Sequence, residues 1–524
     1  MISFGVANVR RLRDVPAIEI RPITILVGRN SSGKSTFLRS FPLIRQSLMT
    51  RTSSPILWYG DLVDFGSYET TVSDNDKRQN ISFFFTVDPI TGPEMRTRDW
   101  LGIGASEDLS QYFSKANYQV TIEPLEHRNK IKTLDVTFRG AMLNFKLQVG
   151  ESGTLTRIQV NGHHMTELPS DIALAVAPGA IFPEMQVVRQ SQPQVAVYSY
   201  WAQERIPEMV EGFISPHLNP RAKADTKRQL AYTLLSMGMM PRDDMLARAE
   251  RTGNRSWDKY VRSISAKDRE EFARQLQRVT ALGNLPWLFN VVTRNLRLIM
   301  GGILYIGPAR ARSERYYRYQ DLAVSEIDPD GKNFPMFLNS LPASQVKSLS
   351  RWVERLFGYG LALSRPEGHI SINLVEGNVE SNIVDTGYGV SQILPVLAQV
   401  WWARERRRPT RSNTSILAIE QPELHLHPAH QALLADALVG EAQSTATAAA
   451  ADRVHFLIET HSETFINRLG ELISDKKIRP KDVHIVLFEA STENDRETTV
   501  SVVGFDESGS LINWPFGFFQ PKVG

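Results

Sequence analysis

The sequence predicts an α/β protein that combines a mixed sheet, an antiparallel β subdomain and a helical insertion. Three stretches lead to this prediction. Residues 23–47 pass from a short, apolar, β-branched run through a glycine-bracketed loop to apolar residues at helical spacing. From 82 to 165 the apolar residues recur with a period of two, which is typical of antiparallel strands. From about 201 to 300 the spacing becomes helical.

The composition narrows the class of protein. The 524 residues allow a large core, and 60 basic against 57 acidic residues leave a net charge of only +3, so a nucleic-acid or membrane site must be a local patch. The absence of cysteine excludes disulfides, thiolate zinc sites, iron–sulfur clusters and cysteine nucleophiles, and it fits a cytoplasmic protein. Because Arg10 precedes any long apolar run and no uncharged stretch is long enough to span a bilayer, we expect neither export nor membrane insertion.

The first glycine-rich loop reads G-x-x-x-x-G-K-S from Gly28 to Ser35, after an apolar run and before a helical pattern. This is the strand, loop and helix context of a P-loop. The glycines let successive N–H groups point inward, and the helix N-terminus adds partial positive charge, so the loop suits a triphosphate. We predict that Lys34 reaches the β- and γ-phosphates and that Ser35 holds Mg²⁺. The predicted nucleotide-binding residues here are Asn30, Ser31, Ser32, Gly33, Lys34, Ser35 and Thr36.

Two short strands, 2–9 and 17–20, precede the loop and are joined by a charged turn. Its arginines, at positions 10, 11 and 13, either contact phosphate or base or form a solvated turn. Residues 54–73 are predicted to be an ordered loop. The antiparallel meander from 82 to 165 includes a hairpin turn at 161–162 and an excursion between strands at 89–116.

Four helices are predicted between the two halves of the chain, at 201–214, 226–240, 265–282 and 286–300. A strand at 303–306 then leads into a stretch that mixes arginines 310, 312, 315 and 318 with tyrosines. Arginine beside tyrosine can bind phosphates and stack bases, and it can equally bridge two lobes of one protein. After it we expect one amphipathic helix and its exit at 336–363, a hairpin around Gly377 and a flexible loop at 442–451.

The second half of the chain repeats the pattern of a glycine turn before a helix. Gly387 and Gly389 precede Ser391, which makes Gly389 and Ser391 further candidates for nucleotide binding. An apolar strand ends at Glu420, where a carboxylate can take Mg²⁺ through water, as in a Walker B motif. A later strand ends just before His461, which can donate a hydrogen bond to a γ-phosphate.

These motifs, in this order, resemble the ABC-type ATPase heads of the RecF, SMC and overcoming-lysogenization-defect group. The branch concerned is that of stand-alone ATPases, similar to the ATPase subunit of Septu or retron-associated anti-phage systems. The resemblance covers 1–85 and 300–524, and it rests on GRNSSGKST, YIGPARA, DTGYGVSQILP, IEQPELHLHP, ETHSETFINRL and NWPFGFF.

The resemblance implies an ABC-type ATPase head that uses ATP and Mg²⁺. It also implies a homodimer, or a higher even oligomer, in which Ser391 contacts the γ-phosphate held by the other subunit. We expect the N-terminal part of the head at 1–85, the antiparallel β subdomain at 86–200, the helical insertion at 201–300 and the C-terminal part of the head at 301–524.

The chain departs from this pattern at two places. GYGVSQ replaces the transporter-type signature LSGGQ, and Gln421 stands where the wider class keeps a catalytic glutamate. Because glutamine cannot take a proton from water, either Glu423 polarises the water, or hydrolysis is slow and the ATP-bound dimer is the working state. Gln421, Glu423 and His461 are therefore the predicted catalytic residues. Histidines 425, 427 and 430 are interpreted as D-loop and helix-start residues, with metal binding as the lesser alternative.

The function predicted from these observations is a cytoplasmic ATPase whose nucleotide state controls a separately encoded nuclease, of the HNH type, in anti-phage defence. Retron DNA or RNA, or phage DNA, is a further expected partner. The alternative is a RecF- or SMC-like DNA-binding ATPase in DNA repair. In the family that the chain resembles, members that cut DNA themselves carry a Toprim domain after the ATPase. A nuclease within the chain is disfavoured because the sequence after His461 has no glutamate strand followed by an Asp-x-Asp strand, the pattern of such a domain. The insertion and the missing signature disfavour half of a transporter.

Overall fold

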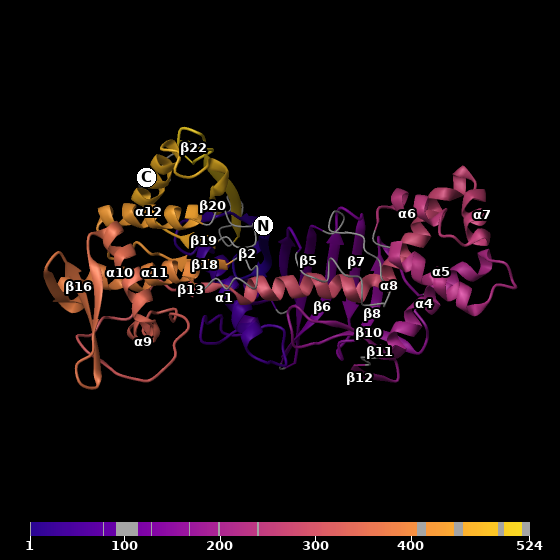
Figure 1. Cartoon of the computed structure of the whole chain (residues 1–524), viewed down its shortest axis with the longest axis horizontal. Helices are drawn as coiled ribbons and strands as arrows, with labels where there is room; N and C mark the ends of the chain where they lie inside the picture. The colour runs from indigo at the N-terminus through magenta and orange to yellow at the C-terminus, as the bar shows by residue number, and fades with distance from the viewer. Residues whose placement is uncertain are drawn as a thin grey trace.

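The computed structural model describes residues 2–76, 78–90, 114–126, 128–166, 168–196, 200–237, 240–405, 415–444, 454–490 and 497–515. The chain forms an elongated molecule with two large sheets and a group of helices at one end (Figure 1). Most of the predicted excursion at 89–116, of the flexible loop at 442–451 and of the NWPFGFF motif lies outside the described residues.

The sheet that carries the glycine-rich loop has seven strands in the order β13-β18-β19-β3-β20-β21-β22. Strands β13 to β20 along this order are parallel, and β21 and β22 are antiparallel. The predicted mixed sheet is therefore confirmed. The strands are β3 (Ile23–Gly28), β13 (Leu304–Ile306), β18 (Ser415–Glu420), β19 (Val454–Glu459), β20 (Val483–Ala490), β21 (Thr498–Phe505) and β22 (Leu511–Ile512).

Strand β3 lies in the middle of this sheet and is buried on both faces, which explains its unbroken apolar run. Leu26 packs into the core that also holds the apolar side chains of α1, whereas Ile23, Ile25 and Val27 pack into the core on the opposite face. The helices around the sheet are α1 (Lys34–Met49), α11 (Tyr388–Glu405), α12 (Pro428–Ser444) and α13 (Glu463–Ser474), with short 3₁₀ turns η5 (Ile383–Thr386) and η7 (Pro480–Asp482).

The second large sheet has eight strands in the order β2-β1-β4-β5-β6-β7-β8-β9, with every neighbouring pair antiparallel. The predicted meander is confirmed, and the first two strands of the chain join the same sheet. Its strands are β1 (Ile2–Val9), β2 (Leu12–Ile20), β4 (Ile81–Val87), β5 (Ala116–Leu125), β6 (Arg128–Phe138), β7 (Leu143–Val149), β8 (Leu155–Val160) and β9 (His163–His164). A small sheet of β10 (Ile172–Val176), β11 (Met185–Arg189) and β12 (Gln192–Ala196) follows.

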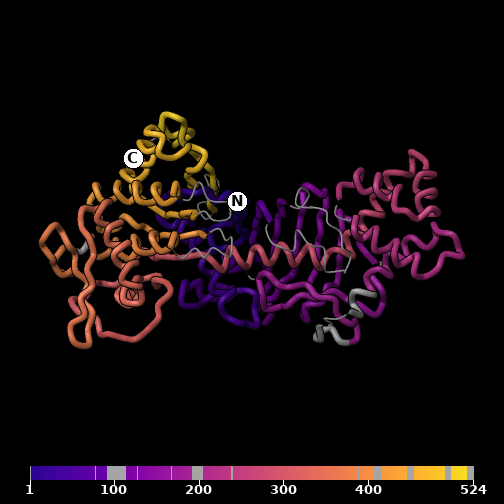
Figure 2. The backbone as a smooth tube through the Cα atoms, viewed as in Figure 1, coloured from indigo at the N-terminus to yellow at the C-terminus, as the bar shows by residue number. Residues whose placement is uncertain are grey.

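The helical insertion consists of α4 (Tyr200–Ile214), η4 (Ser215–His217), α5 (Ala224–Met237), α6 (Arg242–Ala249), α7 (Arg255–Ser263) and α8 (Ala266–Gly301). Helix α8 has 36 residues and packs on the eight-stranded sheet and on α1. Figure 2 traces the chain out to the insertion and back along α8 to the seven-stranded sheet. The insertion is thus connected to the nucleotide-loop region by one long helix.

The break predicted between helices at 265–282 and 286–300 is wrong, because α8 continues through Pro286. A proline inside a helix removes one backbone hydrogen bond. Here the neighbouring Leu282, Leu285, Leu288 and Phe289 are all buried, so packing on every side of the helix offsets this loss.

A smaller lobe contains α9 (Phe334–Ser340), α10 (Ala343–Phe357), β14 (Tyr317–Arg318), β15 (Gly360–Ser364), β16 (His369–Glu376) and β17 (Val379–Asn382). The single helix predicted over 336–363 is wrong: α9 and α10 are separate, because Pro342 forces the preceding Leu341 into an extended conformation. The hairpin around Gly377 is confirmed. In the predicted ordered loop at 54–73 lies the short α2 (Tyr68–Thr71), followed by η1 (Ser73–Asn75). Within the described residues, no helix combines the length and hydropathy needed to cross a membrane.

Candidate nucleotide site

The glycine-rich loop connects β3 to α1 with backbone conformations that favour glycine. Gly28 has φ 154° and Gly33 has φ 96°. A Cβ at position 28 would lie 2.3 Å from the carbonyl oxygen of Phe488, so any other residue there would displace β20. The loop borders a pocket of about 290 Å³ lined by Arg10, Arg11, Ser31, Ser32, Gly33, Lys34, Ser35 and Thr36. Six of the seven predicted loop residues line this pocket, and the seventh, Asn30, is exposed beside it.

Lys34 and Ser35 both approach one carboxylate, that of Glu459 at the end of β19. The Ser35 hydroxyl donates a 2.8 Å hydrogen bond to Glu459 Oε1, and the Lys34 ammonium lies 3.8 Å from the same oxygen and donates to the carbonyl of Arg29. Burial lowers the pKa of Lys34, with Glu459 opposing that shift, and burial raises the pKa of Glu459. Sequence analysis missed Glu459, because its place beside the loop depends on the strand order.

Two polar atoms of this pocket lack partners. Ser32 Oγ and Glu459 Oε2 are buried and have no hydrogen bond within the described part of the chain. A buried polar atom without a partner costs free energy, so these atoms suit a polar ligand. Together with the left-handed glycine and the helix N-terminus, they fit a nucleotide phosphate and an associated Mg²⁺.

The three N-terminal arginines have different surroundings. Arg10 and Arg11 line the pocket, and the Arg10 guanidinium lies 4.6 Å above the ring of Phe65. Burial and the charge of Arg39 lower the pKa of Arg10. Arg13 instead forms an ion pair with Asp74. The sequence allowed these arginines either to contact a phosphate or base or to form a solvated turn. The first alternative fits Arg10 and Arg11, which line the pocket, whereas Arg13 pairs with Asp74.

Glu420, the predicted Walker B acid, is held by two other side chains. Arg39 donates from Nε to Glu420 Oε1 at 2.7 Å and from Nη2 to Oε2 at 2.8 Å, and the Tyr305 hydroxyl donates to Oε1 at 2.7 Å. The structure thus brings Ser35 to Glu459 rather than directly to Glu420. Arg39 also escaped sequence analysis, although its place four residues after Ser35, on the same face of α1, was a usable signal.

The three predicted catalytic residues gather at one edge of the sheet. The backbone N–H of His461 donates to Glu423 Oε1 at 2.7 Å, and the backbone N–H of Gln421 donates to the carbonyl of Glu459 at 2.8 Å. Gln421 has a left-handed φ of 41°, a strained value for a residue with a side chain. Burial raises the pKa of Glu423, whereas burial and the charge of Lys34 lower the pKa of His461.

The arginine and tyrosine stretch after β13 contributes one buried cation to this edge. Arg310 is 6% exposed, and its Nη2 donates to the carbonyls of Glu420 at 3.1 Å and Gln421 at 3.4 Å. Burial lowers its pKa to about 10. Arg315 pairs with Asp385 of η5, whereas Arg312 and Arg318 are exposed. These contacts of Arg310 and Arg315 fit the second of the two alternatives, in which the arginines connect parts of the same protein.

The second glycine turn packs against the loop that follows β18. A Cβ at Gly389 would lie 2.5 Å from the carbonyl oxygen of His425, so a side chain there would push the two apart. Ser391, at the start of α11, is only 6% exposed. His427 Nδ1 accepts a hydrogen bond from Ala429 N at the start of α12, which confirms its position at a helix start. Among the described residues, no three His, Asp or Glu side chains gather as ligands of a metal.

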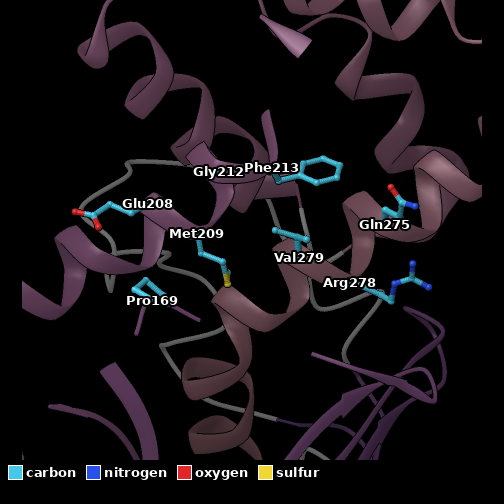
Figure 3. A pocket seen from close by; sticks show the side chains of 8 residues that line it. All are labelled: Pro169, Glu208, Met209, Gly212, Phe213, Gln275, Arg278 and Val279. Atoms are coloured by element: carbon cyan, nitrogen blue, oxygen red, sulfur yellow. The ribbon is translucent and has the colours of Figure 1, made fainter. Parts of the chain in front are cut away.

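A second hollow lies in the insertion, between α4 and α8 (Figure 3). Its volume is about 630 Å³, and Met209 and Val279 contribute apolar side chains from the two helices. We call it the insertion groove; it is lined by Pro169, Glu208, Met209, Gly212, Phe213, Gln275, Arg278 and Val279.

Comparison with known proteins agrees with the nucleotide site. Residues 327–466 match the AAA ATPase domain, a range that contains Glu420, Gln421, Glu423 and His461 but not the glycine-rich loop. This part of the chain is therefore similar to an ATPase domain. Among solved structures it is similar to the SMC head domain from Thermotoga maritima, with 9% sequence identity, a TM-score of 0.28, and coverage of 95% of this chain and 97% of that one. No curated protein matches.

Proposed function

We propose that the chain is an ABC-type ATPase, similar to the SMC and RecF heads, that binds and hydrolyses ATP with Mg²⁺ at the pocket beside β3. The observation that carries this proposal is the convergence of Lys34 and Ser35 on one buried carboxylate beside the pocket of the glycine-rich loop. The AAA ATPase match supports the same reaction from a different part of the chain.

Each residue of the site then has a role in binding or in water activation. Lys34 compensates the phosphate charge, and the loop from Ser31 to Gly33 supplies N–H donors. Ser35 and the acidic strand ends would hold Mg²⁺, which neutralises phosphate charge when bound. Glu423 is the residue proposed to polarise the water, because it is a buried carboxylate with an oxygen, Oε2, that has no partner among the described residues.

The proposal is tested by measuring ATP affinity and hydrolysis with homogeneous protein. Wild type should bind ATP more tightly with Mg²⁺ than with a chelator and should release phosphate. Absence of any ATP binding would overturn the proposed function. A rate close to zero with tight binding would favour the alternative in which the ATP-bound dimer is the working state.

We further propose that ATP closes a homodimer across the glycine turn of α11, with Ser391 contacting the γ-phosphate held by the other subunit. The order of the motifs along the chain supports this geometry. Sedimentation with ATP, with ADP and without nucleotide tests it: association should require ATP, and an unchanged sedimentation coefficient would contradict the dimer.

The effector is proposed to be a separately encoded nuclease of the HNH type in anti-phage defence, contacted through the insertion at 201–300. The support is that no described residue of this part lines the nucleotide pocket, yet its long helix α8 packs on α1, the helix that follows the glycine-rich loop. Deleting 201–300 would not test this cleanly, because it would remove α8 from the core that also contains α1 and the eight-stranded sheet.

A substitution at Gly212 is a cleaner test of the partner contact. A Cβ at Gly212 meets no atom within 4 Å, so Gly212→Trp should partly fill the insertion groove while leaving its walls in place. Gly440 in α12 is equally open, and Gly440→Trp is the matched control. We expect only Gly212→Trp to reduce co-purification of the nuclease encoded beside this chain. Nuclease activity of the chain alone that survives Lys34→Ala would contradict the effector proposal.

A further inference from the structure

We propose that Glu459 is the carboxylate through which this site holds Mg²⁺ beside the P-loop, in the place that the sequence assigns to Glu420. The inference rests on the proposed ATPase function and makes it more specific. Glu420 and Glu459 are register partners at the ends of the neighbouring parallel strands β18 and β19. Either carboxylate is therefore a candidate for holding Mg²⁺.

The contacts of Glu459 are those of a metal-facing acid. Its Oε1 already accepts from Ser35, the predicted Mg²⁺ ligand, and its Oε2 has no partner within the described residues although the side chain is buried. Mg²⁺ in nucleotide sites uses one or two carboxylates together with hydroxyl, water and phosphate oxygens. Ser35 and Glu459 therefore supply two oxygen ligands next to the place where the P-loop receives phosphate.

The contacts of Glu420 are those of a residue that is already neutralised. Both of its oxygens accept from Arg39, in a planar two-point pair, and Oε1 also accepts from Tyr305. A bidentate pair between arginine and carboxylate is among the stronger side-chain interactions. For Glu420 to approach Mg²⁺, these three hydrogen bonds would have to be rearranged, whereas in Glu459 only Oε1 is engaged, by Ser35 and Lys34, and Oε2 has no partner within the described residues.

The backbone also fixes Glu459 independently of Glu420. Strand β19 lies directly beside β3, with Glu459 opposite Leu26, and its carbonyl accepts from the backbone N–H of Gln421. The carboxylate is thus carried by the strand next to the P-loop, and Glu420 is carried by the strand beyond it. The sheet order gives Glu459 the nearer position.

The experiment measures how much Mg²⁺ strengthens ATP binding. The affinity of a fluorescent, non-hydrolysed ATP analogue is measured with Mg²⁺ and with EDTA for wild type, Glu459→Gln and Glu420→Gln. We expect Glu459→Gln to lose about 10- to 100-fold of the gain that Mg²⁺ gives wild type, and to bind the analogue in EDTA at least as tightly, because a negative charge beside the phosphates is gone. Glu420→Gln should keep more of the gain.

A direct metal titration checks the same point without relying on activity. Mn²⁺ binding to the protein with the analogue is followed by electron paramagnetic resonance, and thermal melting confirms that each variant is folded. If Glu420→Gln does not fold, Glu441→Gln, a buried acid of α12 outside the nucleotide site, replaces it as the control.

The possible outcomes separate the inference from the function it depends on. An undiminished Mg²⁺ gain in Glu459→Gln, or an equal or larger loss in Glu420→Gln, overturns the assignment of Glu459 while leaving the ATPase intact. Under that result Glu459 is a partner of Lys34 and Ser35 that moves aside when nucleotide binds. If wild type binds no analogue in either buffer, the proposed function itself fails and the inference falls with it.

Discussion

The nucleotide pocket and the insertion groove differ in volume and in the burial of the charged side chains around them. The pocket measures about 290 Å³ and the groove about 630 Å³. In the groove, Arg278 pairs with Glu271 and Glu208 pairs with Arg205, and the side chains of these acids are 49% and 32% exposed. In the pocket, Lys34 and Glu459 are both only 3% exposed at the side chain.

The candidate site is thus distinguished by unsatisfied burial more than by size. The charged side chains of the groove are paired, and at least one member of each pair is partly exposed, so each pair contributes little free energy. Lys34 and Glu459 at the nucleotide pocket are buried, their pKa values are shifted, and Glu459 Oε2 lacks a partner within the described residues. Such atoms cost stability unless a ligand pairs with them. The following experiments would break this contrast or sharpen it.

The largest expected effect is the loss of ATP binding in Lys34→Ala. Removing the ammonium takes away the cation that the glycine-rich loop itself supplies to the phosphates, a loss of about 3 kcal/mol or more, or at least about 100-fold in affinity. Arg278→Met in the insertion groove is the matched control and should bind ATP like wild type. Calorimetry measures both, and wild-type affinity in Lys34→Ala would remove the distinction between the two hollows.

How far the sequence could predict this site depends on how local each signal is. The P-loop was predictable because strand, glycines, lysine and helix follow one another within 17 residues of chain, from Ile23 to Arg39. The contact between Ser35 and Glu459 spans 424 positions and exists only because β19 lies between β18 and β3. The order of strands in a sheet is set by the packing of whole helices and strands, so no short sequence pattern predicts it.

The same argument explains the errors in the fold. Pro286 is a local signal to end a helix, but the buried leucines around it come into contact with α4, α5 and the sheet only in the folded chain. The opposite error occurred at 336–363, where an apparently continuous amphipathic pattern concealed the local signal of Pro342. Tertiary packing overrode propensity in the first case, and backbone geometry decided the second.

The next effect concerns water activation at the pocket. Gln421→Glu should raise the steady-state ATPase rate, because a carboxylate beside the water can accept its proton, a contribution of about 10² to 10⁴ at most. Glu423→Gln should lower whatever rate wild type has. Phosphate release at saturating ATP measures both. No gain in Gln421→Glu would mean that another group positions the water, and an unchanged rate in Glu423→Gln would exclude Glu423 from that role.

A smaller effect is expected at the subunit contact. Ser391→Ala removes the hydroxyl that would bond to the γ-phosphate of the other subunit, which should weaken ATP-driven association by about tenfold or more. Because Ser391 is 6% exposed, the alanine variant preserves packing that a larger residue would disturb. Sedimentation velocity over a range of protein concentrations measures it. Wild-type association would show that Ser391 lies away from the interface.

Ion pairs in the two regions should also differ in their value for stability. Arg39→Met leaves Glu420 buried without its bidentate partner, which costs about 3–5 kcal/mol for a fully buried pair and about 2 kcal/mol here, since 33% of the Arg39 side chain is exposed. Arg278→Met in the insertion groove should cost less than about 1 kcal/mol, because its partner Glu271 is exposed. Urea unfolding of both variants gives the comparison, and equal costs would contradict it.

The smallest effect is a pH dependence of stability that should come mainly from the head. Burial, and then the charge of Arg21, lower the pKa of His484 in β20 to about 3, and its Nε2 lies 3.2 Å from Thr24 Oγ1. A histidine whose pKa is lower in the folded state stabilises fully above its unfolded value of about 6.5, and this stability is lost as the pH falls below that value. Lowering the pH to 5.5 should therefore cost wild type about 1.4 kcal/mol more than it costs His484→Gln.

His217 in the insertion is stacked on Tyr260, and burial lowers its pKa too. His217→Gln should therefore change the pH dependence of the unfolding free energy in the same direction, but less, because His217 is less buried than His484. Urea midpoints from pH 7.5 to 5.5 measure both variants. If His217→Gln changes the pH dependence more than His484→Gln does, the histidine with the lower pKa lies in the insertion, and the prediction is contradicted.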